Sequence, residues 1–413
     1  MKLAKSLSLG VALALGASGL ALTAPAMAKK AEKPAAGPNV QLSKEYRAAV
    51  LPINADVQAG KFDGISARLD GLAQFQAPDE LYTTAALRYA AAKTGTNTAE
   101  IRKAITGMID SRSTAISNAL QLNTAAGQMA FNAKDFAEAS TRLAEAIRLG
   151  DKEGDTRIIL AEANFQTGKF NEGLAFADQA VAAKQAAGQK APEDWYKRAL
   201  SIAYKNKLPA QIGKWSRAQL MAYPSAESWR TSLVLYRDSG KLEAGMALDL
   251  FRLMRLTKSL AGERDFYEYG QTASDRGLPG ETKSVLEEGM ASGAIGKNVR
   301  PINELLGTAN VKVPGDLASL AAAERQAGTA SSGKQAMGTA DAYLGFGQDA
   351  KAAALYKIAL QKGQIDADAA NTRLGIALAR QGMKVEAKQA FGLVTGARSE
   401  IAKFWVTWLD LKV

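Results

Sequence analysis

Two short stretches of this sequence have nearly the same pattern. "AKDFAEA" occupies Ala133–Ala139, and "TGKFNEG" occupies Thr167–Gly173, which begins 34 residues after the first. Each places Phe in the middle, Glu two residues later, and a small residue at both ends. A fixed period of this length is typical of repeat proteins, in which every repeat is one small unit of supersecondary structure.

Further turns continue the same rhythm along the chain. The turn candidates are Gly60, Gly95, Lys134, Gly168, Asn206, Gly240, Gly277, Lys312, Gly347 and Gly382, at intervals of 34 to 39 residues. The segments between them have helical periodicity, and no segment alternates as a strand would. The sequence therefore predicts an all-α protein of about nine or ten helix-turn-helix hairpins.

The region near the C-terminus has the clearest single repeat. Leu374 and Gly375 form a Leu-Gly pair, Gly382 makes the turn, and Ala387 precedes Phe391 by four positions. This order resembles the tetratricopeptide repeat, which implies a right-handed superhelical solenoid of stacked hairpins. Small residues in such repeats allow two helices to approach closely, and neighbouring hairpins share one continuous core.

The resemblance varies along the chain and suggests how it is divided. It is good over about 120–255 and 333–395, looser over 40–115 and poor over 260–332. We expect an N-terminal array over 41–258, degenerate hairpins with a possible hinge over 259–332, and C-terminal repeats over 333–413.

Two stretches inside the proposed hinge contain helix-breaking residues. "GAIGKNVRP" and "NVKVPGD" are expected to interrupt helices with Gly and Pro. At the C-terminus, "EIAKFWVTWLDLK" is interpreted as a helix that caps the last repeat, the alternative being an aromatic docking helix.

The N-terminus predicts export. Lys2 and Lys5 precede a short apolar run, and "APAMA" ends in the pattern that signal peptidase accepts. We expect a signal peptide over 1–28, cleavage after Ala28, and a flexible tether over 29–40. The predicted location is the bacterial periplasm with no membrane span, the alternative being a retained N-terminal anchor.

The composition excludes several kinds of chemistry. The chain has no Cys and no His, so disulfides, the usual zinc sites and His-based catalysis are excluded. We expect no metal and no cofactor. The net charge of +11 comes from mixed charges and suits an anionic envelope surface better than a nucleic acid.

The resemblance also implies where a partner binds. Ligands of tetratricopeptide arrays lie along the concave groove formed by the first helix of each hairpin. The positions of this chain that match such groove-facing positions, together with Lys205 of the neighbouring basic segment, give seven candidate partner-binding residues. They are Asn132, Gln166, Tyr196, Tyr204, Lys205, Arg230 and Arg237. Asn132 matches one position of the family's carboxylate-binding groove, but the accompanying Lys is missing, so that specific activity is not predicted.

The leading functional hypothesis is a non-enzymatic periplasmic scaffold that binds a protein or an extended peptide. One alternative is binding of an anionic polysaccharide by the segment 195–237, where Lys and Arg alternate with Trp and Tyr. A minor alternative is a glycan-active enzyme that uses a pair of carboxylates. Its candidate residues are Glu263, Asp265, Glu268, Glu287 and Glu288, which are equally well explained as solvated helix charges.

Overall fold

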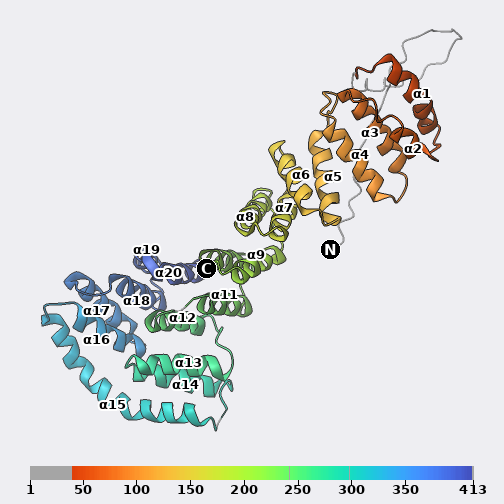
Figure 1. The fold of residues 1–413 in the computed structure, drawn as a ribbon. Coiled ribbons are helices and arrows are strands. Elements are labelled where there is room, and N and C mark those ends of the chain that lie inside the picture. The colour runs from red at the N-terminus through yellow and green to blue at the C-terminus, as the bar shows by residue number, and fades with distance from the viewer. Residues whose placement is uncertain (1–39, 241, 297, 412–413) are drawn as a thin grey trace, which may run out of the picture. The chain divides into compact units, whose positions relative to one another are not determined.

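The computed structural model describes residues 40–240, 242–296 and 298–411. These residues form twenty α-helices and one short 3₁₀ helix, and no strand occurs among them. The predicted all-α class is therefore confirmed (Figure 1). The predicted signal peptide at 1–28 and the tether up to residue 39 lie outside the described residues.

The chain divides into two compact units, and the division falls after Ala191. The change from the N-terminal array to degenerate hairpins that the sequence suggests near residue 258 stays a prediction. The helices of unit 1 are α1 (Lys44–Gln58), α2 (Ile65–Asp70), α3 (Pro78–Ala92), α4 (Thr98–Asp110), α5 (Ala119–Asn132), α6 (Phe136–Arg148), α7 (Gly154–Gln166) and α8 (Phe170–Ala186).

Unit 2 begins at Pro192 and contains the remaining helices. They are α9 (Glu193–Lys205), α10 (Pro209–Ala222), α11 (Ala226–Asp238), α12 (Ala244–Leu256), α13 (Gly262–Asp275), α14 (Pro279–Ala291), α15 (Arg300–Thr329), α16 (Lys334–Gly345), α17 (Asp349–Lys362), α18 (Ala367–Arg380), α19 (Lys384–Gly392), η1 (Gly396–Arg398) and α20 (Ser399–Leu411).

Consecutive helices pack as hairpins, and the same close contact recurs in several of them. A glycine on the first helix faces a large side chain on the second, and a Cβ added there would lie 2.5 to 2.8 Å from that side chain. The pairs are Gly127 with Leu143, Gly270 with Leu286, and Gly375 with Phe391, each separated by 16 positions. This repeated contact is the small-to-large helix packing expected of tetratricopeptide-type hairpins.

Most of the predicted turns have the backbone that a tight helical hairpin requires. The residues with positive φ at these turns are Gly60, Lys134, Gly168, Lys207, Gly277, Gly347 and Gly382. One predicted turn is wrong, because Lys312 lies inside α15.

Helix α15 is a single helix of 30 residues that lies between the hairpins α13–α14 and α16–α17 and packs against α14 and α16. "GAIGKNVRP" separates it from α14 as predicted, but "NVKVPGD" lies within it. Pro314 lacks the N–H that would bond to the carbonyl of Asn310, so it bends the helix without ending it. Buried residues on both sides, such as Ile302 and Leu320, hold the two halves in place. Figure 1 shows the bend.

Helix α20 packs on α19, as predicted for a capping helix. It also returns to α10 and α12, while α18 contacts α12, so the end of unit 2 lies against its beginning (Figure 1). Phe404 and Trp405 are fully buried in this contact. The ring of Phe404 lies 5.4 Å from that of Tyr236. One hydrophobic core consequently runs through unit 2 from α10 to α20.

Candidate functional site

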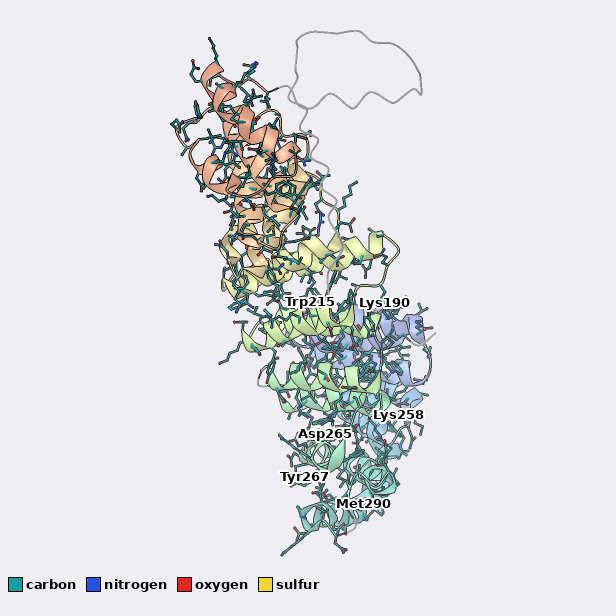
Figure 2. All side chains as sticks on the ribbon, turned by 90° about the vertical axis from the view of Figure 1, so that its right-hand side faces the viewer. Lys190, Trp215, Lys258, Asp265, Tyr267 and Met290 are labelled. Atoms are coloured by element: carbon teal, nitrogen blue, oxygen red, sulfur yellow. The ribbon has the colours of Figure 1, made fainter. Side chains whose placement is uncertain are left out.

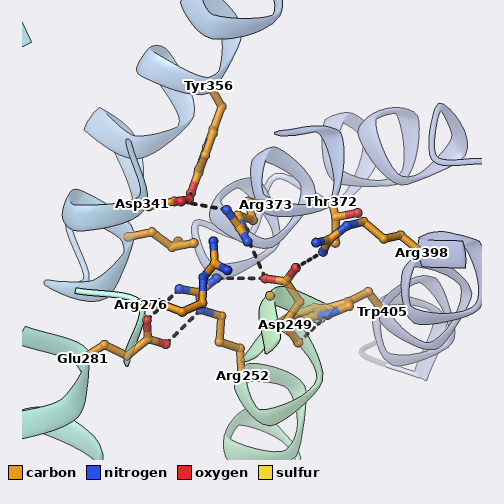
Figure 3. Close-up of polar contacts among 12 residues, drawn as sticks. Asp249, Arg252, Arg276, Glu281, Asp341, Tyr356, Thr372, Arg373, Arg398 and Trp405 are labelled. Atoms are coloured by element: carbon orange, nitrogen blue, oxygen red, sulfur yellow. Dashed lines mark hydrogen bonds and ion pairs between the residues drawn. The ribbon is translucent and has the colours of Figure 1, made fainter. Parts of the chain in front are cut away.

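An ion-pair network lies where the two ends of unit 2 meet, and Asp249 of α12 is at its centre (Figure 3). The Asp249 carboxylate accepts hydrogen bonds from Arg252 at 2.9 Å and Arg398 at 2.7 Å, with Arg373 at 3.4 Å. The side chains of Asp249 and Arg252 are 0% exposed. Because Arg373 and Arg398 follow Asp249 by 124 and 149 residues, these bonds tie distant parts of the chain together.

Glu281 of α14 holds the other side of Arg252. The guanidinium donates to both carboxylate oxygens, at 2.8 and 2.6 Å, and the Tyr269 hydroxyl donates to one of them at 2.7 Å. Burial by itself raises the pKa of Glu281, but the charge and hydrogen bonds of Arg252 outweigh it and lower the pKa to about 2. Burial, followed by the charge of Glu281, raises the pKa of Tyr269.

Each outer arginine also has its own carboxylate. Arg373 donates to Asp341 at 2.7 Å, and Arg398 donates to Glu243 at 3.0 Å. The indole N–H of Trp405 donates to the backbone oxygen of Asp249 at 3.3 Å. The network joins α12 to α14, α16, α18, η1 and α20, and each of its arginines is engaged by carboxylates. Such an arrangement is typical of a structural ion-pair network.

Three hollows open around unit 2. The central hollow, of about 810 Å³, lies between α12, α14, α15, the α16–α17 turn, α18 and α20. A second hollow, of about 740 Å³, lies over the network, and Arg373 and Arg398 are in its wall. The third, of about 450 Å³, lies between α9, α10 and α11 and is called here the α9–α11 groove.

The α9–α11 groove is lined mainly by polar side chains. They include Ser201 and Tyr204 of α9 and Ser228 and Thr231 of α11. Gln219 of α10 is only 2% exposed. Its amide nitrogen is 3.4 Å from a Glu193 oxygen, while its own oxygen has no hydrogen-bond partner among the described residues. Gln219 is therefore a buried polar side chain in the floor of the groove, and the exposed hydroxyl and carboxylate groups around it are the groups that a ligand can reach.

The structure places the predicted partner-binding residues in different environments. Tyr204 lines the α9–α11 groove, and Lys205 is the exposed residue next to it. Asn132 and Gln166 are exposed at the last positions of α5 and α7 in unit 1. Tyr196 is 2% exposed and packs edge-on against Trp215 and Tyr223, so its ring belongs to the core.

Arg230 and Arg237 connect α11 to the next hairpin. Arg230 forms an ion pair with Asp265 of α13 and donates to the backbone oxygen of Ser259. Asp265 is labelled in Figure 2. Arg237 lies 3.4 Å from Glu268 and stacks over the ring of Phe251. Both guanidinium groups are therefore engaged within unit 2.

Other basic side chains of segment 195–237 are also paired. Lys197 lies 3.0 Å from Glu193, and Arg217 forms an ion pair with Glu400. The Trp residues of this segment are buried, including Trp215 (Figure 2). The segment consequently offers a weaker positive surface than its composition suggests.

The carboxylates considered for catalysis are largely held in ion pairs. Asp265 pairs with Arg230, Glu268 with Arg237 and Arg264, Glu287 with Lys283, and Glu288 with Arg255, while Glu263 is exposed. No group of three or more acidic side chains arranged to hold a metal ion occurs among the described residues.

Sequence reasoning missed the Asp249 network, although one signal was present. "MALDLFRLM", from Met246 to Met254, places Asp249 and Arg252 three positions apart in an otherwise apolar helix. Charges at buried helix positions are rare unless they are paired, so this stretch pointed to an internal ion pair.

Among residues 40–240, 242–296 and 298–411, no helix is both long and apolar enough to cross a membrane. No protein-family model matches the chain, and no curated protein matches its sequence.

Several solved structures resemble the chain. A tetratricopeptide repeat protein from Parabacteroides merdae is 15% identical, with 71% of this chain and 100% of that chain covered and a TM-score of 0.27. Naa15/Naa10 bound to HypK-THB gives 13% identity, 86% and 69% coverage and a TM-score of 0.26. Yeast Tom70 is 11% identical, with 89% of this chain and 88% of that chain covered and a TM-score of 0.22. The fold assignment rests on the hairpin packing within the chain itself.

Proposed function

We propose that this protein is a non-enzymatic interaction scaffold, and that unit 2 holds an extended segment of a partner protein in the α9–α11 groove. The observation that carries the proposal is the groove itself. Hydroxyl groups of Ser201, Ser225 and Thr231 line it, and Tyr204 is 39% exposed at its side. An extended peptide has regularly spaced backbone N–H and C=O groups that can pair with such hydroxyl groups.

The charges of the groove favour a basic partner segment. Glu193 and Glu227 line it together with Lys197, and Lys197 is already paired with Glu193 at 3.0 Å. The remaining acidic side chain, Glu227, is exposed. A Lys or Arg of the partner would therefore be attracted here. This is the opposite of the basic groove expected from the composition of segment 195–237.

Location in the bacterial periplasm is part of the proposal and rests on the predicted signal peptide at 1–28. The alternative of an anionic polysaccharide has less support, because Arg217, Arg230 and Arg237 are engaged with carboxylates. The enzyme alternative also has less support, because most of its candidate carboxylates are engaged in ion pairs with Arg or Lys.

A peptide array tests the groove directly. Arrayed peptides of graded charge are probed with the full chain, and basic extended peptides are expected to bind best. Thr231→Arg places a bulky cation in the groove and is expected to abolish this binding. Met221→Arg changes an exposed residue of α10 outside the lining and serves as the matched control. Equal binding by both variants would exclude the groove.

Photocrosslinking in the source cells would identify the natural partner. A benzoylphenylalanine replaces Tyr204 in the groove, or Tyr267 of α13 as a control outside it. Crosslinks to a partner are expected from position 204 and not from position 267. The crosslinks from position 204 should disappear when the Thr231→Arg substitution is added. The same crosslinks from both positions would contradict the proposal.

A further inference from the structure

The central hollow of unit 2 is a second site, independent of the α9–α11 groove. Its volume of about 810 Å³ lies within the range of small-molecule sites, roughly 300–1,000 Å³. A small molecule is therefore an occupant of suitable size.

The bent helix α15 provides one apolar wall. Val313 and Leu317 line the hollow on either side of Pro314, and Leu317 is 43% exposed. Helix α15 lies between the hairpins α13–α14 and α16–α17 and packs against both. These neighbours leave Val313 partly exposed and Leu317 exposed toward the hollow.

The opposite walls add further apolar surface. Phe346 comes from the α16–α17 turn, Leu256 from the end of α12, and Trp408 from α20. Gly280 allows the ring of Phe346 to lie close to α14, since a Cβ there would be 2.3 Å from the ring. The hollow therefore presents aliphatic and aromatic surface from several separate elements.

Most charges around the hollow neutralise one another. Arg255 pairs with Glu288 at 2.5 Å, Lys283 with Glu287 at 3.7 Å, and Arg380 with Asp349 at 3.5 Å. The fourth acid of the lining, Glu281, is held by Arg252 from the network.

Lys258 is the remaining cation of the lining. It is exposed, follows the end of α12, and has no ion pair with a carboxylate of the described residues. Figure 2 labels it. The hollow thus combines apolar surface on α15, Phe346 and Trp408 with one cation that has no carboxylate partner in the described part of the chain. This combination is complementary to an apolar chain that ends in one negative charge.

We propose that the central hollow binds a single-chain amphiphile with one acidic head group, such as a fatty acid. The chain lies against Val313, Leu317 and Phe346, and the carboxylate lies at Lys258. The ligand would cover the exposed surface of α15 without disturbing the ion pairs around it.

Titration with dodecanoate, below its micellar concentration, tests this proposal. Trp408 lines the hollow, so a saturable change in tryptophan emission is expected, and Trp408→Phe should remove it. Leu317→Glu should abolish the binding, whereas Val311→Glu should leave it unchanged, because Val311 is 82% exposed on the same helix but outside the lining. Circular dichroism of each variant checks that the helices remain folded.

The head group is tested with a neutral probe. Lys258→Glu replaces an attraction with a repulsion and is expected to weaken dodecanoate about tenfold while leaving dodecanol unchanged. The absence of saturable binding for both probes would overturn the proposal. It would also be overturned if Val311→Glu weakened binding as much as Leu317→Glu, since that result indicates adsorption to the surface.

Discussion

Replacing Asp249 with Asn tests whether the central network closes unit 2. The substitution keeps the shape of the side chain but removes the negative charge that faces Arg252, Arg373 and Arg398. The new amide group also directs N–H donors toward guanidinium groups that only donate. We expect the free energy of unfolding of unit 2 to fall.

The size of the loss follows from the remaining contacts. Removing one partner from a buried ion pair costs about 3–5 kcal/mol. After the substitution each arginine keeps one carboxylate: Glu281, Asp341 and Glu243, respectively. No guanidinium is left entirely unpaired, so the expected loss is near the lower limit, about 3 kcal/mol.

Urea unfolding followed by tryptophan fluorescence measures this loss in unit 2 specifically. All five Trp residues lie at or after position 195, so their emission reports on unit 2 alone. With an m-value of about 3 kcal/mol per M, the midpoint should fall by about 1 M urea. Circular dichroism should then separate the earlier transition of unit 2 from that of unit 1.

Asp238→Asn is the matched control. Its carboxylate is 48% exposed and pairs with Arg237 at 3.1 Å, so its removal should cost less than about 1 kcal/mol. If Asp249→Asn moved the midpoint no further than this control, the network would not stabilise the closed unit and the reasoning would be refuted.

Three further predictions follow from other contacts. The pKa of Glu281 is lowered to about 2, so the stability that its ionised carboxylate contributes is present above its ordinary pKa and is lost as pH falls from about 4.5 toward 2. Acid unfolding followed by Trp emission should show this loss. Glu281→Gln should remove that pH dependence. Gly375→Ala should lower the free energy of unfolding by about 1–3 kcal/mol, because its Cβ would lie 2.6 Å from the ring of Phe391. Gly307→Ala, with open space around it, should raise the free energy of unfolding by about 0.5–1 kcal/mol. Thermal melts compare the two variants. Arg88→Met removes two ion pairs and a serine hydrogen bond within unit 1 and should lower the free energy of unfolding of that unit by about 1–2 kcal/mol. The unfolding transition seen by far-UV circular dichroism should shift, while the transition seen by Trp fluorescence should not. A shift of both transitions would contradict separate unfolding of the two units.

The α9–α11 groove could be predicted only in part. Tyr204 was identified because the family resemblance marks positions on the first helix of each hairpin. Gln219 was missed because it lies on the second helix, where its burial and its unpartnered oxygen depend on the packing of α10 between α9 and α11. Arg230 and Arg237 have the predicted residue type, but the acids that engage them come from the next hairpin.

The bend of α15 shows a different limit. Pro and Gly in "NVKVPGD" predicted a break, since a proline removes one helical hydrogen bond and favours a helix end. Whether the helix ends or bends depends on what the following residues can bury. Leu320 and Ala327, beyond the proline, are buried, and their burial accompanies continuation of the helix.

The sequence alone determined the period of the repeat, its helical class and most of its turns. These features depend on interactions within about 35 residues, so they recur as a readable pattern. Only the tertiary structure decided that α20 returns to α10 and α12, and that Asp249 meets arginines 124 and 149 residues away. Such contacts are made once and have no period, and small rotations summed over many hairpins determine which side chains meet.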